Sequence, residues 1–238
     1  MDQVEVLPLT TRVRVRIARD PAPDEAPPGT PLYDEWARLC AMNPRLHNGP
    51  ILSVVTLDAE QGDILVRRET YQRLAAQPRV ATGVRLFAVT AVLTARDRAG
   101  RSLVLFGRRS DGVRIYPGMW ELGPSGGIGV PAASMDIMDE ALLLRSLADE
   151  VEEEVGERIA SGAPIAVVRD HVARSDDVVF RIDLGTIDDF ARAAPANWEY
   201  TQTRWVHDVP AFLAAHGDEV IAPTRALVRA LGLGTPAR

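Results

Sequence analysis

The sequence contains no lysine, a single cysteine and no long hydrophobic run, and each absence narrows the class of protein. All 27 basic residues are arginine, so any side-chain cation that meets a phosphate is a guanidinium, which binds oxyanions through two parallel hydrogen bonds. Because Cys40 stands alone, no internal disulfide can form, which agrees with a reducing cytoplasm. No segment approaches the roughly 18 uninterrupted apolar residues that a membrane helix needs.

Positive charge is also in deficit. The formal net charge of −6 argues against non-specific binding to nucleic acid, which depends on a basic face. The first residues lack the basic start and apolar run of a secretory signal. Hydrophobic residues make up 46% of the chain and charged residues 25%, as in folded soluble proteins. We therefore expect a folded cytoplasmic protein that binds neither nucleic acid nor a membrane.

Residues 1–80 are expected to form a β-rich extension. Alternating hydrophobicity predicts that residues 4–9 and 12–17 form a pair of strands, and a Pro-rich break then precedes a short helix at 32–42. Two further strands and a helical turn are expected at 50–57, 64–66 and 70–77.

Residues 81–238 are expected to form the main domain. A loop rich in Gly and Pro at 110–129 precedes the longest helical pattern, which covers roughly residues 136–155 and ends at Gly156, a residue typical of helix C-caps. The other strands and helices are expected at 85–94, 102–106, 165–168, 178–184, 210–216 and 224–231. Strands and helices mixed in this order predict an α/β protein with a central mixed sheet.

The long helix carries an acidic cluster beside an apolar stripe. At 100° per residue, one face collects the apolar residues Ile137, Ala141, Leu144, Ala148, Val151 and Val155. A neighbouring face collects the acidic residues Glu150, Glu153, Glu154 and Glu157. Like charges one turn apart repel each other, and a divalent cation such as Mg²⁺, which prefers oxygen ligands, removes that repulsion. The alternative is a solvated acidic helix end, although such charges oppose the helix dipole.

Four segments, in the same order, resemble the motifs of the Nudix hydrolases. Residues 149–156, Asp-Glu-Val-Glu-Glu-Glu-Val-Gly, resemble the second half of the Nudix box. The other three segments are the Pro-Gly-Met-Trp-Glu lead-in at 117–121 with the glycine pair 126–127, a strand ending in arginine at 103–110, and a late strand at 204–209. The resemblance extends over residues 84–232.

The box departs from the family pattern at several positions. Asp149 stands where the family has arginine, Ala141 where it has the first glutamate, and Glu157 where it has an apolar residue. The stretch from Gly127 to the box is also longer than usual. The glutamates that handle metal and water in the family remain, at Glu150, Glu153 and Glu154. Loss of structural residues with retention of these glutamates favours an active, divergent enzyme.

A segment ahead of this unit resembles one branch of the family. Residues 43–50, Asn-Pro-Arg-Leu-His-Asn-Gly-Pro, are similar to a segment of the UDP-glucose and UDP-galactose Nudix pyrophosphatases. Those proteins also resemble this chain in a longer loop before the helix and in the missing arginine of the box. The alternative is an ordinary turn of Pro, Asn and Gly that leads into a strand.

The resemblance implies a fold and a reaction. The fold is a Nudix α/β/α sandwich with a mixed central sheet at 81–238, preceded by the extension at 1–80. The reaction is hydrolysis of the diphosphate linkage of a nucleoside diphosphate derivative with Mg²⁺, or Mn²⁺, as cofactor. A UDP-sugar that yields UMP and a sugar 1-phosphate is the best interpretation of the substrate.

The resemblance also implies the residues of the site. The expected catalytic residues and metal ligands are Glu150, Glu153 and Glu154, and the expected further metal ligand is the backbone carbonyl of Gly127. The expected substrate contacts are Arg109, Gly126 and Gly127.

Three alternatives remain open from the sequence. One is a non-catalytic Nudix domain that senses a nucleotide and regulates a partner. Another keeps the reaction and replaces the substrate with ADP-ribose, NADH or coenzyme A. In the third, residues 1–80 are not part of the active site. They form a module that binds a partner or joins two copies of the chain into a homodimer.

Overall fold

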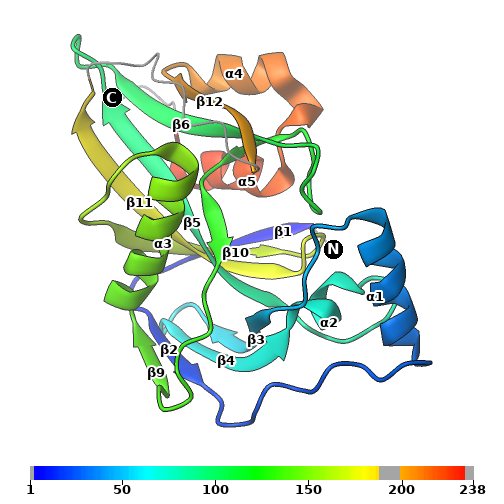
Figure 1. Cartoon of the computed structure of the whole chain (residues 1–238). Coiled ribbons are helices and arrows are strands. Elements are labelled where there is room, and N and C mark those ends of the chain that lie inside the picture. The colour runs from blue at the N-terminus through cyan, green and yellow to red at the C-terminus, as the bar shows by residue number, and fades with distance from the viewer. Residues whose placement is uncertain (1–2, 188–198, 234–238) are drawn as a thin grey trace.

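A twisted mixed sheet with helices on both faces forms the centre of the molecule (Figure 1). The structure is a computed structural model that describes residues 3–187 and 199–233. The strands are β1 (Val4–Pro8), β2 (Arg14–Ile17), β3 (Pro50–Asp58), β4 (Asp63–Thr70), β5 (Leu86–Arg96), β6 (Ser102–Arg109), β7 (Trp120–Leu122), β8 (Ser125–Gly127), β9 (Ile137–Asp139), β10 (Ala163–Asp170), β11 (Ser175–Thr186) and β12 (Tyr200–Val206). The helices are α1 (Pro31–Met42), α2 (Tyr71–Ala75), α3 (Glu140–Val155), α4 (Val209–His216) and α5 (Ala222–Leu231), with a 3-10 turn at Gly217–Glu219.

β5 is the central strand of the sheet. The main path runs β1-β10-β11-β5-β3-β4-β2-β9, and β6, β7, β8 and β12 join it beside β5. The pairs β11–β5 and β2–β4 are parallel, and the other pairs are antiparallel. The expected α/β class with a mixed sheet is therefore confirmed.

Alternate residues of the central strands enter two hydrophobic cores. Val89 on β5 and Phe180 on β11 belong to the core under α3. Val92 and Val179, on the same two strands, belong to the core under α4 and α5. Since successive side chains of a strand point to opposite faces, this division produces three layers, with α3 on one side of the sheet and α4 and α5 on the other (Figure 1).

The long helix begins later than expected, and the predicted apolar stripe is wrong in part. Residues 137–139 form β9, which pairs with β2, and Asp139 caps the helix by accepting a hydrogen bond from the Leu142 N–H at 3.0 Å. The buried apolar residues of α3 are Leu143, Leu147, Val151 and Val155. Of the expected stripe, Ile137 and Ala141 are exposed, and Leu144 and Ala148 are half-buried. The expected end at Gly156 is confirmed, with φ of 73°.

The expected pairing of the first two strands is wrong. β1 pairs with β10, and β2 pairs with β4 and β9. Alternating hydrophobicity reveals which face of a strand is buried but not which neighbour it joins, and the Val15 and Ile17 side chains of β2 are buried against the α3 core.

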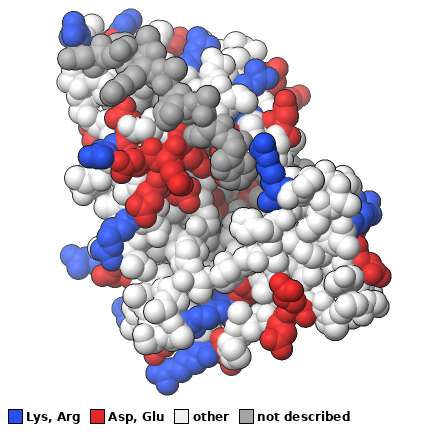
Figure 2. Space-filling model, viewed as in Figure 1, with Lys and Arg blue, Asp and Glu red and all other residues white. Residues whose placement is uncertain are grey.

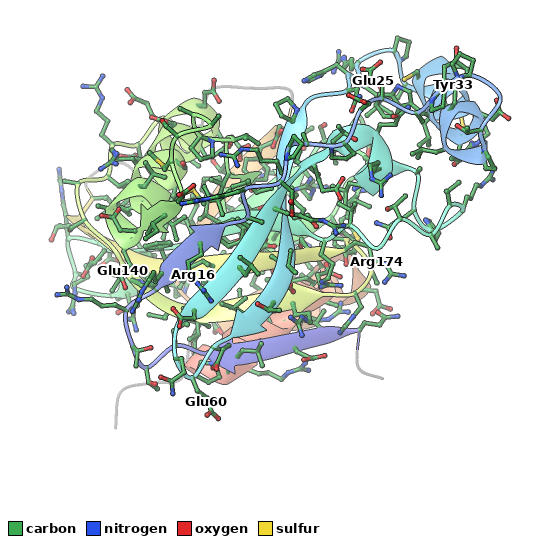
Figure 3. The ribbon with its side chains drawn as sticks, turned by 90° about the horizontal axis from the view of Figure 1, so that it is seen from below. Arg16, Glu25, Tyr33, Glu60, Glu140 and Arg174 are labelled. Atoms are coloured by element: carbon green, nitrogen blue, oxygen red, sulfur yellow. The ribbon has the colours of Figure 1, made fainter. Side chains whose placement is uncertain are left out.

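Residues on both sides of position 80 contribute to the α3 core. Val15, Leu52 and Val66 lie in the same hydrophobic cluster as Phe87 and Phe180. The division of the chain into domains at residue 80 stays a prediction. α1 and α2 lie at one end of the molecule, and Glu25 and Tyr33 lie far from Glu140 at the start of α3 (Figure 3). None of the helices in the described ranges could cross a membrane.

Candidate active site

A cavity of about 770 Å³ lies between the sheet, the loop that follows β6, and the segment that leads from α1 into β3. This volume lies in the range of small-molecule pockets, roughly 300–1,000 Å³. Figure 2 shows acidic side chains gathered over the C-terminal end of α3, beside a hollow that faces the end of the molecule carrying α1. The cavity thus adjoins the acidic end of the helix.

The floor of the cavity is a patch of small and polar residues on the sheet. Thr90 of β5 and Asp177 of β11 line it. Further along the same face of the same strands, Val92 and Val179 pack under α4 and α5. The side chains on this face therefore change from apolar residues packed under the helices to Thr90 and Asp177 at the cavity.

Two of the predicted glutamates, Glu150 and Glu154, lie behind the cavity wall, next to the lining residues Gly126 and Glu199. Glu154 is buried at 4% exposure and shares a hydrogen bond with Glu199, which lines the cavity. The Glu150 carboxylate packs against Gly126 of β8, in the space where a Cβ at position 126 would lie. Glu153 is exposed on the same helix, close enough for its charge to act on Glu150.

Burial makes these carboxylates difficult to ionise. It is the largest cause that raises the pKa of Glu150 to about 7, and the charges of Glu199 and Glu153 add to it. Burial also raises the pKa of Glu154 far above its usual range, followed by the hydrogen bond with Glu199. A hydrogen bond between two carboxyl groups requires a proton on one of them, so full ionisation at neutral pH requires a compensating cation.

The loop after β6 contains two strands where an irregular loop was expected. β8 pairs with β5 in the register Ala88↔Gly127, which places the predicted residues Gly126 and Gly127 at the cavity wall. β7 pairs with β6 and carries Glu121, which is 4% exposed. Glu121 is a cavity residue that the sequence analysis did not assign, although it belongs to the lead-in motif.

Arg109, a predicted substrate contact, lines the cavity and forms a buried ion pair. Its Nη1 donates to Glu121 Oε1 at 2.6 Å, and its Nε donates to the Ile115 carbonyl at 3.1 Å. The Tyr200 hydroxyl donates to the same Glu121 oxygen at 2.7 Å. The charge of Glu121 raises the pKa of Arg109 despite burial of the guanidinium, the largest influence, which lowers it. Arg109 is thus a fixed positive charge on the wall.

The acidic residues fit a divalent cation by their chemistry. Within residues 3–187 and 199–233, no three His, Cys, Asp or Glu side chains already converge as a metal-ligand shell. Mg²⁺ usually keeps several waters and takes only one or two protein carboxylates, with substrate phosphate completing its shell. Glu150, Glu154 and Glu199 supply carboxylate oxygens, and a bound cation would favour the ionised forms of Glu150 and Glu154 that burial disfavours.

The segment 43–50 forms one wall of the cavity. Asn43, Arg45 and His47 are among its lining residues. Asn48 anchors the segment, because its side-chain oxygen accepts from the Gln72 N–H at 2.9 Å and its amide donates to Glu25 at 3.0 Å. A segment from the N-terminal part of the chain therefore lines the same cavity as Arg109 and Gly126.

Comparison with known proteins gives distant structural similarities. The chain matches no protein-family model and no curated protein. The structure is similar to the MutT protein from Methanosarcina mazei Go1, with a TM-score of 0.44, 21% identity, and coverage of 62% of this chain and 94% of that one. A Deinococcus radiodurans protein gives a TM-score of 0.48 at 18% identity, covering 76% of this chain and 98% of that one.

The NUDIX domain of Shewanella oneidensis NrtR, complexed with ADP ribose, gives a TM-score of 0.45 at 18% identity, covering 63% of this chain and 87% of that chain. Because these TM-scores lie below 0.5, we base the assignment of function on the residues of the site.

Proposed function

We propose that the protein is a Mg²⁺-dependent hydrolase of the Nudix type, which cleaves the diphosphate linkage of a nucleoside diphosphate derivative. The observation that carries the proposal is the placement of Glu150 and Glu154 against Gly126 and Glu199 at the wall of a ligand-sized cavity. Burial of a carboxylate is costly unless it is hydrogen-bonded or binds a cation, and Glu154 is only 4% exposed.

The chain's own residues have distinct roles in this proposal. Glu150, Glu154 and Glu199 would hold Mg²⁺, with the Gly127 carbonyl as a further ligand. The ion supplies charge neutralisation on the phosphoryl oxygens and lowers the pKa of water. Glu153, on the solvent side of Glu150, would accept the proton of the attacking water.

Guanidinium groups would position the diphosphate. Arg109 is held by Glu121 at the cavity wall, and Arg45 and Arg114 also line the cavity. Phosphoryl transfer depends on positioning and charge stabilisation more than on covalent chemistry. An arginine fixed by an ion pair, near carboxylates that would hold a metal, suits this requirement.

The finer proposal is that the substrate is a UDP-sugar, which would yield UMP and a sugar 1-phosphate. Two features of the segment 43–50 support this substrate. The segment resembles one in the UDP-sugar branch, and it lines the cavity. ADP-ribose, NADH and coenzyme A are the competing substrates of the same reaction.

The experiment is a Mg²⁺-dependent assay of the purified chain with UDP-glucose, UDP-galactose, ADP-ribose, NADH and coenzyme A, in which released monophosphates are measured. We expect turnover of the UDP-sugars that falls by about 100-fold or more in Glu154→Gln. Glu152→Gln is the matched control, because Glu152 lies on the same helix but is exposed and pairs with Arg158. Turnover of another compound would reject the UDP-sugar, and nucleotide binding without any turnover would support the sensing alternative.

A further inference from the structure

The arginines that line the cavity lie on its walls, together with Glu121 and Glu199, whereas the described residues of its floor include carboxylates and no arginine. Arg45, Arg109 and Arg114 line the walls made by the N-terminal segment and the loop after β6, whereas Asp170 and Asp177 line the floor on β10 and β11. The diphosphate of a substrate can therefore pair with arginines on the cavity walls. The part of the substrate that reaches the floor meets carboxylates instead.

Asp177 is the floor carboxylate that has an oxygen without a hydrogen-bond partner in the described residues. Its Oδ2 accepts from the Thr90 hydroxyl at 3.0 Å, and its Oδ1 is buried without a hydrogen-bond partner in the described residues. Burial raises the pKa of Asp177 to about 6, while hydrogen bonds from Ser175 and Thr90 lower it and so favour the ionised form. An ionised carboxylate only accepts hydrogen bonds, so hydroxyl groups satisfy it and other anions do not.

Asp170 differs from Asp177, because both of its carboxylate oxygens already accept hydrogen bonds within the protein. Oδ1 accepts from the N–H groups of Val172 and Ala173 at 2.7 and 3.0 Å. Oδ2 accepts from the Tyr116 hydroxyl at 2.7 Å. Tyr116 has φ of 54°, a strained conformation for a non-glycine residue, and such strain persists only where surrounding contacts enforce it. Asp170 thus holds Tyr116 at the cavity wall, while its negative charge remains close to Asp177.

We infer that the floor formed by Thr90 and Asp177 is a subsite for a neutral group that carries hydroxyls, and that Asp177 makes this subsite reject an acidic group. The inference rests on the proposed function, since it assigns the non-phosphate end of the substrate to the floor. It predicts that the protein distinguishes a neutral sugar nucleotide from the corresponding uronate, in which a carboxylate replaces the terminal CH₂OH.

The test is equilibrium binding of UDP-glucose and UDP-glucuronate to the full chain without added metal, measured by titration calorimetry. Binding without turnover keeps this test separate from the hydrolase assay. We expect the wild-type protein to bind UDP-glucose about tenfold more tightly than the uronate, from like-charge repulsion at short range. In Asp177→Asn the ratio should fall to about twofold.

Two further variants show whether the effect is specific. Thr90→Val removes the hydroxyl that holds Asp177 and should weaken UDP-glucose binding while thermal unfolding remains cooperative. Asp183→Asn is the matched control, because Asp183 is exposed on the same strand and accepts a hydrogen bond from the Gly185 N–H; it should leave the ratio unchanged.

Three outcomes would overturn the inference: equal wild-type affinities for the two ligands, an unchanged ratio in folded Asp177→Asn, or no binding of either ligand. If the ratio behaves as expected and no substrate is hydrolysed, the subsite is supported and the proposed hydrolase is rejected. If a substrate is hydrolysed but the wild type binds UDP-glucose and UDP-glucuronate equally, the hydrolase is supported and the subsite is rejected.

Discussion

The carboxylate of Glu150 lies against the backbone of Gly126, in the space that any side chain at position 126 would need. Glu150 is on the last turns of α3, and Gly126 is on β8, which pairs with β5. This contact joins the acidic helix to the cavity wall. It also explains in physical terms why a glycine stands at this position of the loop.

We predict that Gly126→Ala abolishes most activity without unfolding the protein. The added methyl would displace the Glu150 carboxylate, and small displacements of groups that position a reaction cost on the order of 100-fold in rate. Gly129→Ala is the matched control, because a Cβ at Gly129 meets no atom within 4 Å. Normal turnover in a folded Gly126→Ala variant would show that this contact is unimportant.

A second prediction concerns the stability of the metal-free protein. Because burial raises the pKa of Glu150 from 4.5 to about 7, the folded state holds a proton that the unfolded state has released. The stabilising contribution is complete below about pH 4.5 and is lost as pH rises through about 7. We expect the unfolding temperature in EDTA to fall over this interval and to recover on addition of Mg²⁺.

Glu150→Gln should reverse this behaviour. The amide cannot ionise, so the variant should be more stable than the wild type in EDTA at about pH 8, and less responsive to Mg²⁺. Loss of turnover together with a gain in stability is the expected result, as at other sites where function opposes stability. A decrease in the unfolding temperature of this variant at that pH would contradict the account.

The ion pair of Arg109 with Glu121 gives a third prediction. Removing one partner of a buried pair leaves an uncompensated charge and costs about 3–5 kcal/mol. We therefore expect Arg109→Met to lower the free energy of unfolding by about 3 kcal/mol, measured by urea denaturation. The double variant Arg109→Met with Glu121→Gln should recover part of the loss. A loss well under about 1 kcal/mol in the single variant would place Arg109 among ordinary surface arginines.

The anchor of the N-terminal wall gives a fourth prediction. Asn48→Ala removes the hydrogen bonds to Gln72 and Glu25 that fix the segment 43–50. We expect KM to rise by about tenfold with kcat largely retained, because uniform binding is lost while the catalytic glutamates stay in place. A fall in kcat with unchanged KM would mean that this segment does not contact the substrate.

The local parts of this fold could be predicted from sequence. The helical pattern and Gly156 identified the end of α3, although Glu154 lies on the buried face of the helix rather than on a separate acidic face. The helices expected at 32–42, 210–216 and 224–231 are present as α1, α4 and α5. Each of these features depends on residues within a few turns of one another, where periodicity and capping residues are informative.

The features that depend on long-range pairing could not be predicted. Glu121 reaches the site because β7 pairs with β6. Glu199 reaches it because β12, which begins at the next residue, pairs with the same strand from far along the chain. Residues 137–139, expected in the long helix, instead form β9 and pair with β2 from the N-terminal part of the chain. Asp177 carried no motif, and only the register of β11 against β5 places it beside Thr90.

The most direct test of the central claim is binding of a divalent ion to the acidic end of α3. Mn²⁺ can be titrated into the purified protein and the free ion measured by its paramagnetic resonance signal. We expect saturable binding that is lost in Glu154→Gln and retained in Glu152→Gln, because Glu154 is buried beside Glu199 and Glu152 faces solvent. Equal binding by the wild type and Glu154→Gln, or no binding by either, would contradict the assignment of a metal-dependent hydrolase.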